Sequence, residues 1–236
     1  MNRMKLAIVG AMDSEIIYLK DKMQENGKIK EKEIHGFVFY LGRLFDKDII
    51  LVKSGVGRVA SAILLTILCD HFKGIDKIIN VGVAGGYGNL YVGDIVVGEK
   101  CVYGDADLTA FTKYVYGQMS NCPAYFDADK EIIDKLKEND MYCKYVCICT
   151  NETFMTEYDY AKKLIDDHFS DLNVGAFDME SAAFAQAAYV LKMPFIAIRA
   201  ISDVIGDSEQ VDKYKMSTDD SAKKSNIFLL KLIEIL

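Results

Sequence analysis

Short apolar segments that end in glycine alternate along this chain with longer amphipathic segments. Leu6 to Val9 is a continuous apolar run closed by Gly10, and residues 78–82 form a second, largely apolar run that ends in glycine. This pattern is typical of strands buried on both faces by helices. The alternation predicts an α/β fold in three layers, with a central mixed, largely parallel sheet flanked by helices.

The periodicity of apolar residues predicts the order of the elements. Strands are expected at 6–9, 37–41, 48–54, 78–82, 94–97, 145–150, 174–177 and 195–201, and the one that begins at 94 could extend to 103. Helices are expected after Asp13, which can cap the first of them, and at 59–72, 130–141, 158–169, 179–191 and 221–236. Residues 104–125 show no clear period, and a loop of this length is a candidate functional or interface segment.

Length and composition favour one domain over residues 1–236. An α/β fold of 236 residues commonly holds a single core, and 51% hydrophobic residues can build a sizeable interior. With two prolines in the chain, there is no Pro-rich linker at which to divide it.

Charge and residue spacing exclude several classes of partner. A net charge of -7 without a basic cluster argues against nucleic acid. Asp13 and Glu15 follow the first apolar run too closely for a signal peptide or a membrane span, so we expect a cytoplasmic protein without a membrane partner. The six cysteines and three histidines have no metal-ligand spacing, so no metal is expected.

Four expected strand ends carry small or acidic residues, and ligands of such sheets bind beyond the carboxyl ends of the strands. The four segments are 10–15, 54–57, 82–86 and 202–203. Glycines there allow backbone N–H groups to approach a ligand, although any one segment could equally be a tight turn. None matches a dinucleotide or Walker A pattern, so no cofactor is expected.

Two carboxylates at these ends have alternative interpretations. Asp203 follows an apolar strand, where burial would raise its affinity for a proton and suit a general acid, but it could also cap a helix. Glu180 lies where a strand passes into a helix of small residues. It could accept hydrogen bonds from two vicinal hydroxyls of a ribose, or it could be favourable charge at a helix N-terminus.

Seven segments, in this order and spacing, resemble the 5′-methylthioadenosine/S-adenosylhomocysteine nucleosidases, within the superfamily of purine nucleoside and uridine phosphorylases. They span almost the full length of the chain. They are AIVGAMDSE (7–15), KSGVGRVA (53–60), NVGVAGG (80–86), VGDIVV (92–97), DADLTAF (105–111), DMESAA (178–183) and RAISDV (199–204).

The resemblance implies hydrolysis of the N-glycosidic bond, which releases adenine and a 5-thio-substituted ribose. Asp203 would donate a proton to N7 of adenine, and Ser202 would fix its carboxylate. Glu15 would orient and deprotonate the attacking water. An acid at the base and a carboxylate with water at the opposite face are the parts that such a cleavage needs.

The resemblance also implies the substrate contacts. Met179 and Glu180 would hold the ribose, Phe154 would stack on adenine, and the backbone of Met155 would read its Watson–Crick edge. Further expected contributors are Met12, Val83 and, as support for the acidic cluster, Arg199. The family forms homodimers, in which loop 104–125 would complete the partner's site through Leu108 and Phe111.

Departures from the superfamily pattern bear on the nucleophile. Val83 stands where the phosphorylases use Ser to bind phosphate, Asn80 stands at their arginine position, and Glu15 would repel an oxyanion. These residues favour water. The remaining alternatives are a phosphorolytic purine nucleoside phosphorylase, a nucleosidase for another 5′-modified purine nucleoside, and a nucleoside-binding domain without catalysis.

Overall fold

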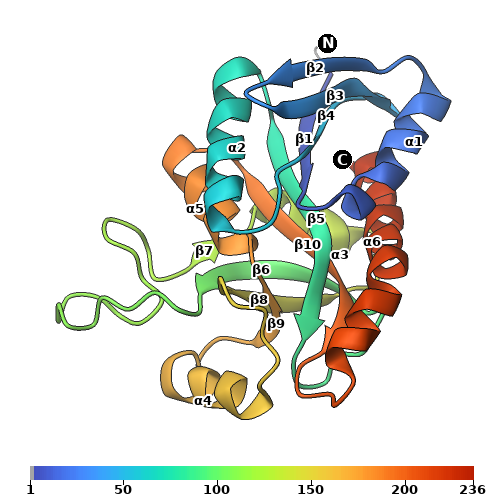
Figure 1. Ribbon diagram of the computed structural model, residues 1–236. Helices are drawn as coiled ribbons and strands as arrows, with labels where there is room; N and C mark the ends of the chain where they lie inside the picture. Colours follow the sequence, from blue (N-terminus) through green and yellow to red (C-terminus); the bar gives the residue numbers. More distant parts are fainter. Residues whose placement is uncertain (1–2) are drawn as a thin grey trace.

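A computed structural model, which describes residues 3–236, places helices on both faces of a continuous sheet (Figure 1). α2 (Arg58–His71) and α5 (Ser181–Leu191) cover one face, while α1 (Ile17–Asn26) and α6 (Gln210–Ile235) cover the other (Figure 1). The three-layer α/β arrangement expected from the alternating apolar segments is confirmed.

The strands and helices have the following bounds. The strands are β1 (Lys5–Gly10), β2 (Lys30–Ile34), β3 (Phe37–Leu44), β4 (Lys47–Lys53), β5 (Lys77–Gly86), β6 (Ile95–Tyr103), β7 (Phe126–Asp127), β8 (Lys144–Thr150), β9 (Val174–Asp178) and β10 (Phe195–Val204). The helices are the 3-10 helix η1 (Asp13–Glu15), α1 (Ile17–Asn26), α2 (Arg58–His71), α3 (Lys130–Glu138), α4 (Tyr158–His168), α5 (Ser181–Leu191) and α6 (Gln210–Ile235).

β5 lies at the centre of the sheet and pairs with three other strands. β1 and β10 run parallel to it on either side, and β9 pairs antiparallel with its last two residues, Gly85 and Gly86. Through β6 and β8 the chain of pairings returns from β10 to β9, so five strands close into a ring. The sheet is mixed, as expected, and five of its ten strand pairs are parallel.

Three apolar clusters hold these layers together. The first packs α2 and α5 on one face of the sheet, and the second packs α1, α3 and α6 on the other. The third lies between α4 and the strands β8 and β9. The helices therefore pack against both faces of the sheet, and this packing fixes the relative positions of the carboxyl ends of β1, β5 and β10.

Three predictions about local structure were wrong. α6 begins at Gln210 rather than near 221, because its first turns are polar and present no apolar stripe to the sequence. β2 was not expected, since this mostly exposed strand of charged residues lies at the sheet edge and needs no buried face. Asp13 does not cap α1, which begins after Ile16, but pairs with Lys53 at 2.8 Å.

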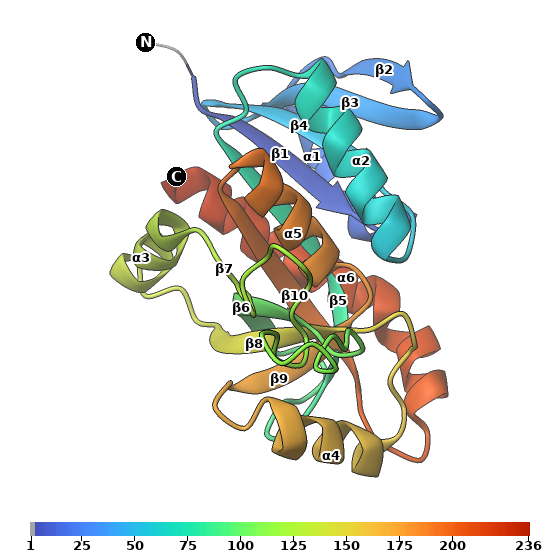
Figure 2. The same cartoon turned by 90° about the vertical axis from the view of Figure 1, so that its left-hand side faces the viewer.

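Residues 104–125, all of which are described, form a long loop without helix or strand, as expected. The loop projects from the body of the molecule on the side of α2 and α5 (Figures 1 and 2). At its base, both Nη atoms of Arg58 donate to Asp105, at 2.6 and 2.9 Å. Further along, Tyr116 stacks on His168 with ring centroids 3.9 Å apart, so the loop is anchored at two points.

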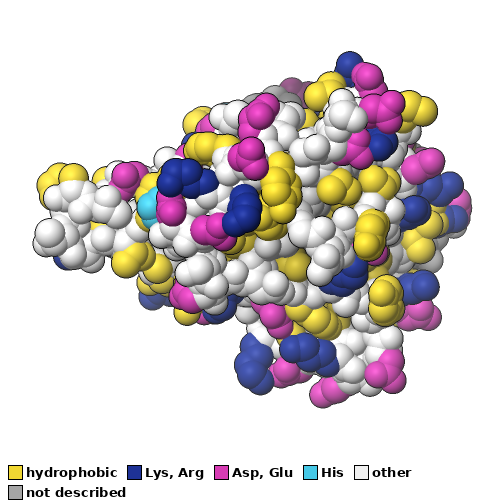
Figure 3. Space-filling view, turned by 90° about the horizontal axis from the view of Figure 1, so that it is seen from below, with side chains coloured by type: hydrophobic (Ala, Val, Ile, Leu, Met, Phe, Trp, Pro, Cys, Tyr) yellow, Lys and Arg dark blue, Asp and Glu magenta, His cyan; other side chains and the backbone are white. Residues whose placement is uncertain are grey.

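On the face seen from below, basic and acidic side chains are interspersed rather than gathered by sign (Figure 3). Within residues 3–236, every helix is too short or too polar to cross a membrane.

Candidate active site

The carboxyl ends of β1, β5 and β10 and the turn from β9 into α5 surround a cavity of about 70 Å³. Eight of the residues expected from the sequence line it: Met12, Glu15, Val83, Phe154, Met179, Glu180, Ser202 and Asp203. Met155 lines an adjoining cavity of about 20 Å³. Among the described residues, neither Leu108 nor Phe111 lines either cavity of this chain, and Phe111 is 62% exposed.

Glu15 lies at the end of η1, directly beyond β1, and both of its carboxylate oxygens are held. Oε2 accepts from the N–H groups of Ala11 at 2.6 Å and Met12 at 2.9 Å, and Oε1 accepts from Val83 at 3.0 Å. Gly82 makes this approach feasible, since a Cβ there would collide with Oε1 of Glu15. Burial raises the pKa of Glu15, although Arg199 and the backbone donors oppose the rise. The result is a fixed carboxylate with an increased affinity for a proton.

Asp203 lies inside β10 rather than at a helix end, so the alternative of a helix cap is wrong. The register of β10 against β5 shifts between Ile201 and Asp203, and this irregularity re-aims the side chains at the strand end. Ser202 Oγ donates to Oδ1 of Asp203 at 2.6 Å, and Gln210 Nε2 donates to Oδ2 at 2.7 Å. Burial raises the pKa of this fully enclosed carboxyl, and the two donors oppose the rise.

Glu180 stands directly before α5, but its side chain points across to another element. Its Oε1 accepts from the N–H of Gly57, at the start of α2, at 2.8 Å. Burial and the neighbouring carboxylate of Asp178 raise the pKa of Glu180 to about 8, against the opposing effects of Gly57 and Arg199. A carboxyl that shares its pocket with other carboxyls holds its proton more tightly.

A buried guanidinium lies beneath these carboxylates. Arg199, 1% exposed, donates through Nη2 to Asp178 at 2.8 Å and to Ser181 Oγ at 2.9 Å, and through Nη1 to the carbonyl of Asn80 at 3.1 Å. Burial alone would lower the pKa of Arg199, but the surrounding carboxylates, Asp178 foremost, raise it. Arg199 therefore supplies the positive charge that an acidic pocket needs.

The mouth of the cavity is lined by two aromatic rings and a thioether. Phe154 is 38% exposed, and its ring centroid lies 5.1 Å from that of Tyr214, edge to face. The hydroxyl of Tyr214 donates to Met12 Sδ at 3.7 Å. These side chains form an apolar rim over the carboxylates, which suits a planar heterocycle.

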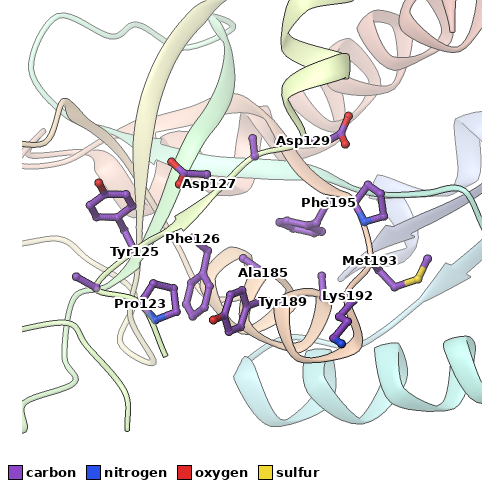
Figure 4. Close-up of a pocket in the computed structure, with 14 residues that line it drawn as sticks. Pro123, Tyr125, Phe126, Asp127, Asp129, Ala185, Tyr189, Lys192, Met193 and Phe195 are labelled. Atoms are coloured by element: carbon purple, nitrogen blue, oxygen red, sulfur yellow. The ribbon is translucent and has the colours of Figure 1, made fainter. Parts of the chain in front are cut away.

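A larger surface pocket of about 800 Å³ opens at the opposite end of β10, where Phe195 begins the strand (Figure 4). Its two carboxylates are engaged by lysines, Asp129 by Lys77 at 2.9 Å and Asp127 by Lys100 at 2.5 Å. Within residues 3–236, no group of three His, Cys, Asp or Glu side chains is arranged to hold a metal ion. Glu15, Glu180 and Asp203 line the smaller cavity instead.

Comparisons with known proteins agree over the whole chain. The family model of the phosphorylase superfamily matches residues 5–234. The 5′-methylthioadenosine/S-adenosylhomocysteine nucleosidase of Psychromonas ingrahamii is 39% identical over 236 residues, which cover 98% of each chain. The crystal structure of the S-adenosylhomocysteine nucleosidase of Streptococcus pyogenes, in complex with 5-methylthiotubericidin, has a TM-score of 0.91 and 35% identity, covering 100% of this chain and 98% of that one.

This chain belongs to the nucleosidase family of the phosphorylase superfamily. Another member, the nucleosidase of Streptococcus pneumoniae with the transition-state inhibitor MT-ImmA, has a TM-score of 0.90 and 34% identity, covering 98% of this chain and 99% of that one. The family resemblance and the nucleoside phosphorylase-like fold expected from the sequence are confirmed.

Sequence reasoning did not identify four polar residues at or beside the site. Gln210 and Tyr214 lie on the first turns of α6, which were expected to be loop. Asn226, further along α6, donates from Nδ2 to the carbonyl of Glu15 at 2.9 Å. Asp178 is the first residue of the DMESAA segment, and its place in that segment was the signal that could have identified it.

Replacing Glu180 by Gln tests the electrostatic strain in the site. The amide keeps an acceptor for Gly57 but removes a carboxyl whose folded-state pKa of about 8 exceeds its usual 4.5. Because the folded protein holds this proton more tightly than the unfolded chain, wild-type stability falls as the pH rises through that window. We expect the melting temperature of Glu180→Gln to exceed that of the wild type by a margin that grows from about pH 5 to about pH 8. Each kcal/mol of difference in the free energy of unfolding corresponds to roughly 2–4 °C.

Thermal unfolding of both proteins by circular dichroism across this pH range provides the measurement. A melting-temperature difference that is the same at every pH contradicts the raised pKa of Glu180.

Proposed function

We propose that this chain hydrolyses the N-glycosidic bond of 5′-methylthioadenosine and S-adenosylhomocysteine, releasing adenine and the 5-thio-substituted ribose. The observation that carries the proposal is the pair of buried carboxyls with raised pKa, Glu15 and Asp203, on one small cavity. Cleavage through an oxocarbenium-like sugar needs an acid at the leaving group and a base for water. The choice of these two substrates follows the names of the related nucleosidases.

Asp203 is the acid in this proposal. Adenine leaves poorly as an anion, so protonation at N7 lowers the barrier to departure. Burial keeps the proton on Asp203 to a higher pH than an exposed carboxyl would, and Ser202 orients the carboxyl by its 2.6 Å hydrogen bond. A proton donor of raised pKa at the end of β10 suits this step.

Glu15 is the base, and it acts on water. Its two oxygens are fixed by three backbone N–H groups, so the carboxylate is oriented before substrate arrives. Val83 brings no hydroxyl to the site, and Asn80 is engaged with Val9 and Arg199. Among the described residues, those that line the cavity include no cation, and Arg199 beneath it is paired with Asp178, so a phosphate would find no free positive charge here.

The remaining residues hold the substrate. Glu180, with Met179 beside it, accepts hydrogen bonds from the ribose hydroxyls, and the ring of Phe154 stacks on adenine. The backbone of Met155 reads the Watson–Crick edge of the base, and Met12 contributes to the apolar rim. Because the cavity draws residues from η1 at one end of the chain to α6 at the other, residues 1–236 act as one domain in this proposal.

We also propose that two copies form a cytoplasmic homodimer, with loop 104–125 completing the partner's site through Leu108 and Phe111. Exposed apolar side chains gather on the elements of one side of the molecule: Val59 and Ile63 on α2, Tyr189 and Val190 on α5, and Phe111 and Val115 on the loop. α2 and α5 pack against each other, and the loop projects beside them (Figure 2). Such a surface is typical of a subunit interface.

The nucleophile separates hydrolysis from phosphorolysis, the nearest alternative. We expect adenine to be released from 5′-methylthioadenosine at the same rate with and without inorganic phosphate, together with free 5-methylthioribose. Chromatography of products from a panel of 5′-substituted adenosines makes the measurement. Strict dependence on phosphate, with a sugar 1-phosphate as product, would establish a phosphorylase instead.

Complementation between two inactive variants tests the shared site. Asp203→Asn removes the acid, and Leu108→Asp with Phe111→Asp disables the loop, so each homodimer should be inactive. In a mixed dimer the intact Asp203 of one chain faces the intact loop of the other. We expect mixing to restore about a quarter of wild-type activity per total subunit, since half of the dimers then carry one complete site.

The control for this experiment is each variant mixed with itself under the same conditions. If mixed dimers form, as judged by differently tagged chains, and remain inactive, the loop serves its own chain's site or none.

A further inference from the structure

The side-chain amide of Gln210 bridges two acceptors on residues that line the site. Its Nε2 donates to Asp203 Oδ2 at 2.7 Å and to the carbonyl of Met155 at 2.8 Å. Gln210 is 3% exposed, so the bridge is enclosed rather than incidental to the surface. One NH₂ group therefore satisfies two acceptors that would otherwise be buried without a partner.

The free volume around this bridge is far too small for the proposed substrate. The two cavities that meet at Asp203 measure about 70 Å³ and about 20 Å³, whereas sites for small molecules commonly measure ~300–1,000 Å³. Tyr214, one helical turn beyond Gln210, also lines the larger cavity. Asp203 lines both cavities and Met155 lines the smaller one, so the Gln210 amide occupies acceptors of two residues that border the free space.

We infer that the Gln210 amide is an internal stand-in for the exocyclic amino group of a 6-aminopurine, and that the base must displace it to bind. This inference rests on the proposed function, which brings adenine to Asp203 and Met155. An exocyclic NH₂ offers the same two donors as Nε2 of Gln210. A 6-oxopurine would instead set an oxygen against two acceptors, so the same pair selects an amino-bearing base.

Displacement of Gln210 from Asp203 and Met155 requires movement only at the beginning of α6. Downstream, Ser221 Oγ donates to the carbonyl of Ile201 at 3.2 Å, and Asn226 donates to the carbonyl of Glu15, which tie the helix to β10 and η1. Upstream, Gln210 is held locally, its Oε1 accepting from the N–H of Gly206 at 3.1 Å. Release of the Gln210 side chain breaks its hydrogen bonds with Gly206, Met155 and Asp203. The bonds of Ser221 and Asn226 keep the rest of α6 attached.

Gln210 therefore competes with the base, and its removal should strengthen binding. We expect Gln210→Ala to lower the Kd for adenine by about tenfold, the loss of one or two competing hydrogen bonds. Isothermal titration calorimetry of the full chain with adenine measures this without catalysis. Gln210→Ser, whose side chain is too short to bridge but suits the start of a helix, should behave alike.

Val211→Ala is the matched control, because Val211 is the next residue of α6 and is 46% exposed. It should leave the adenine Kd unchanged, and hypoxanthine should bind much more weakly than adenine to every variant. Circular dichroism confirms that each variant is folded before titration.

The opposite result would overturn the inference. If Gln210 only steadies Asp203 for the base, both Gln210 variants will bind adenine equally or more weakly than wild type. Hydrolysis of 5′-methylthioadenosine by the wild type separates the two proposals. If the wild type is active and the Gln210 variants bind adenine no more tightly, the competition by Gln210 is refuted and the proposed hydrolysis stands. Absence of adenine binding in wild type and variants refutes the competition, and the hydrolysis assay then shows whether the proposed function falls too.

Discussion

The buried guanidinium of Arg199 is the interaction on which the site depends. It lies within β10 and donates to groups on β5, on β9 and at the start of α5, so one side chain ties together three other elements. An ionised group withdrawn from water costs several kcal/mol unless it is paired, and Asp178 provides the pair. The positive charge then lets Glu15 and Glu180 lie close by, with pKa values lower than their burial alone would produce.

The sheet brings the carboxylates of the site together at one edge. β5 lies between β1 and β10, so the parallel strands deliver Glu15 and Asp203 to one edge, and the closing of the ring through β9 adds Glu180. Gly82 and Gly85 leave the space that the two carboxylates occupy, since a Cβ at either position would approach a carboxylate oxygen closely. Strain from crowded carboxyls is therefore built into the folded state, and we propose that catalysis uses it.

The sequence carried much of this information, because strands buried on both faces and glycines at their ends are local patterns. The carboxylates at those ends, and the family resemblance of the segments around them, could be found without a structure. Gln210 and Tyr214 could not, since the first turns of α6 are polar and their positions depend on packing against distant strands. The ring closure through β9 was also invisible, because strand pairing joins residues far apart in the chain.

The most direct test of Asp203 as the acid is the fate of the 7-deaza analogue of 5′-methylthioadenosine, in which carbon replaces the nitrogen that is to be protonated. We predict that this compound occupies the site, as measured by competitive inhibition of 5′-methylthioadenosine hydrolysis, but yields no free base. Protonation at N7 is worth at least about 100-fold in rate for a general acid, so the loss should be plain. Release of the deazapurine at a rate close to that of adenine would contradict the central role given to Asp203.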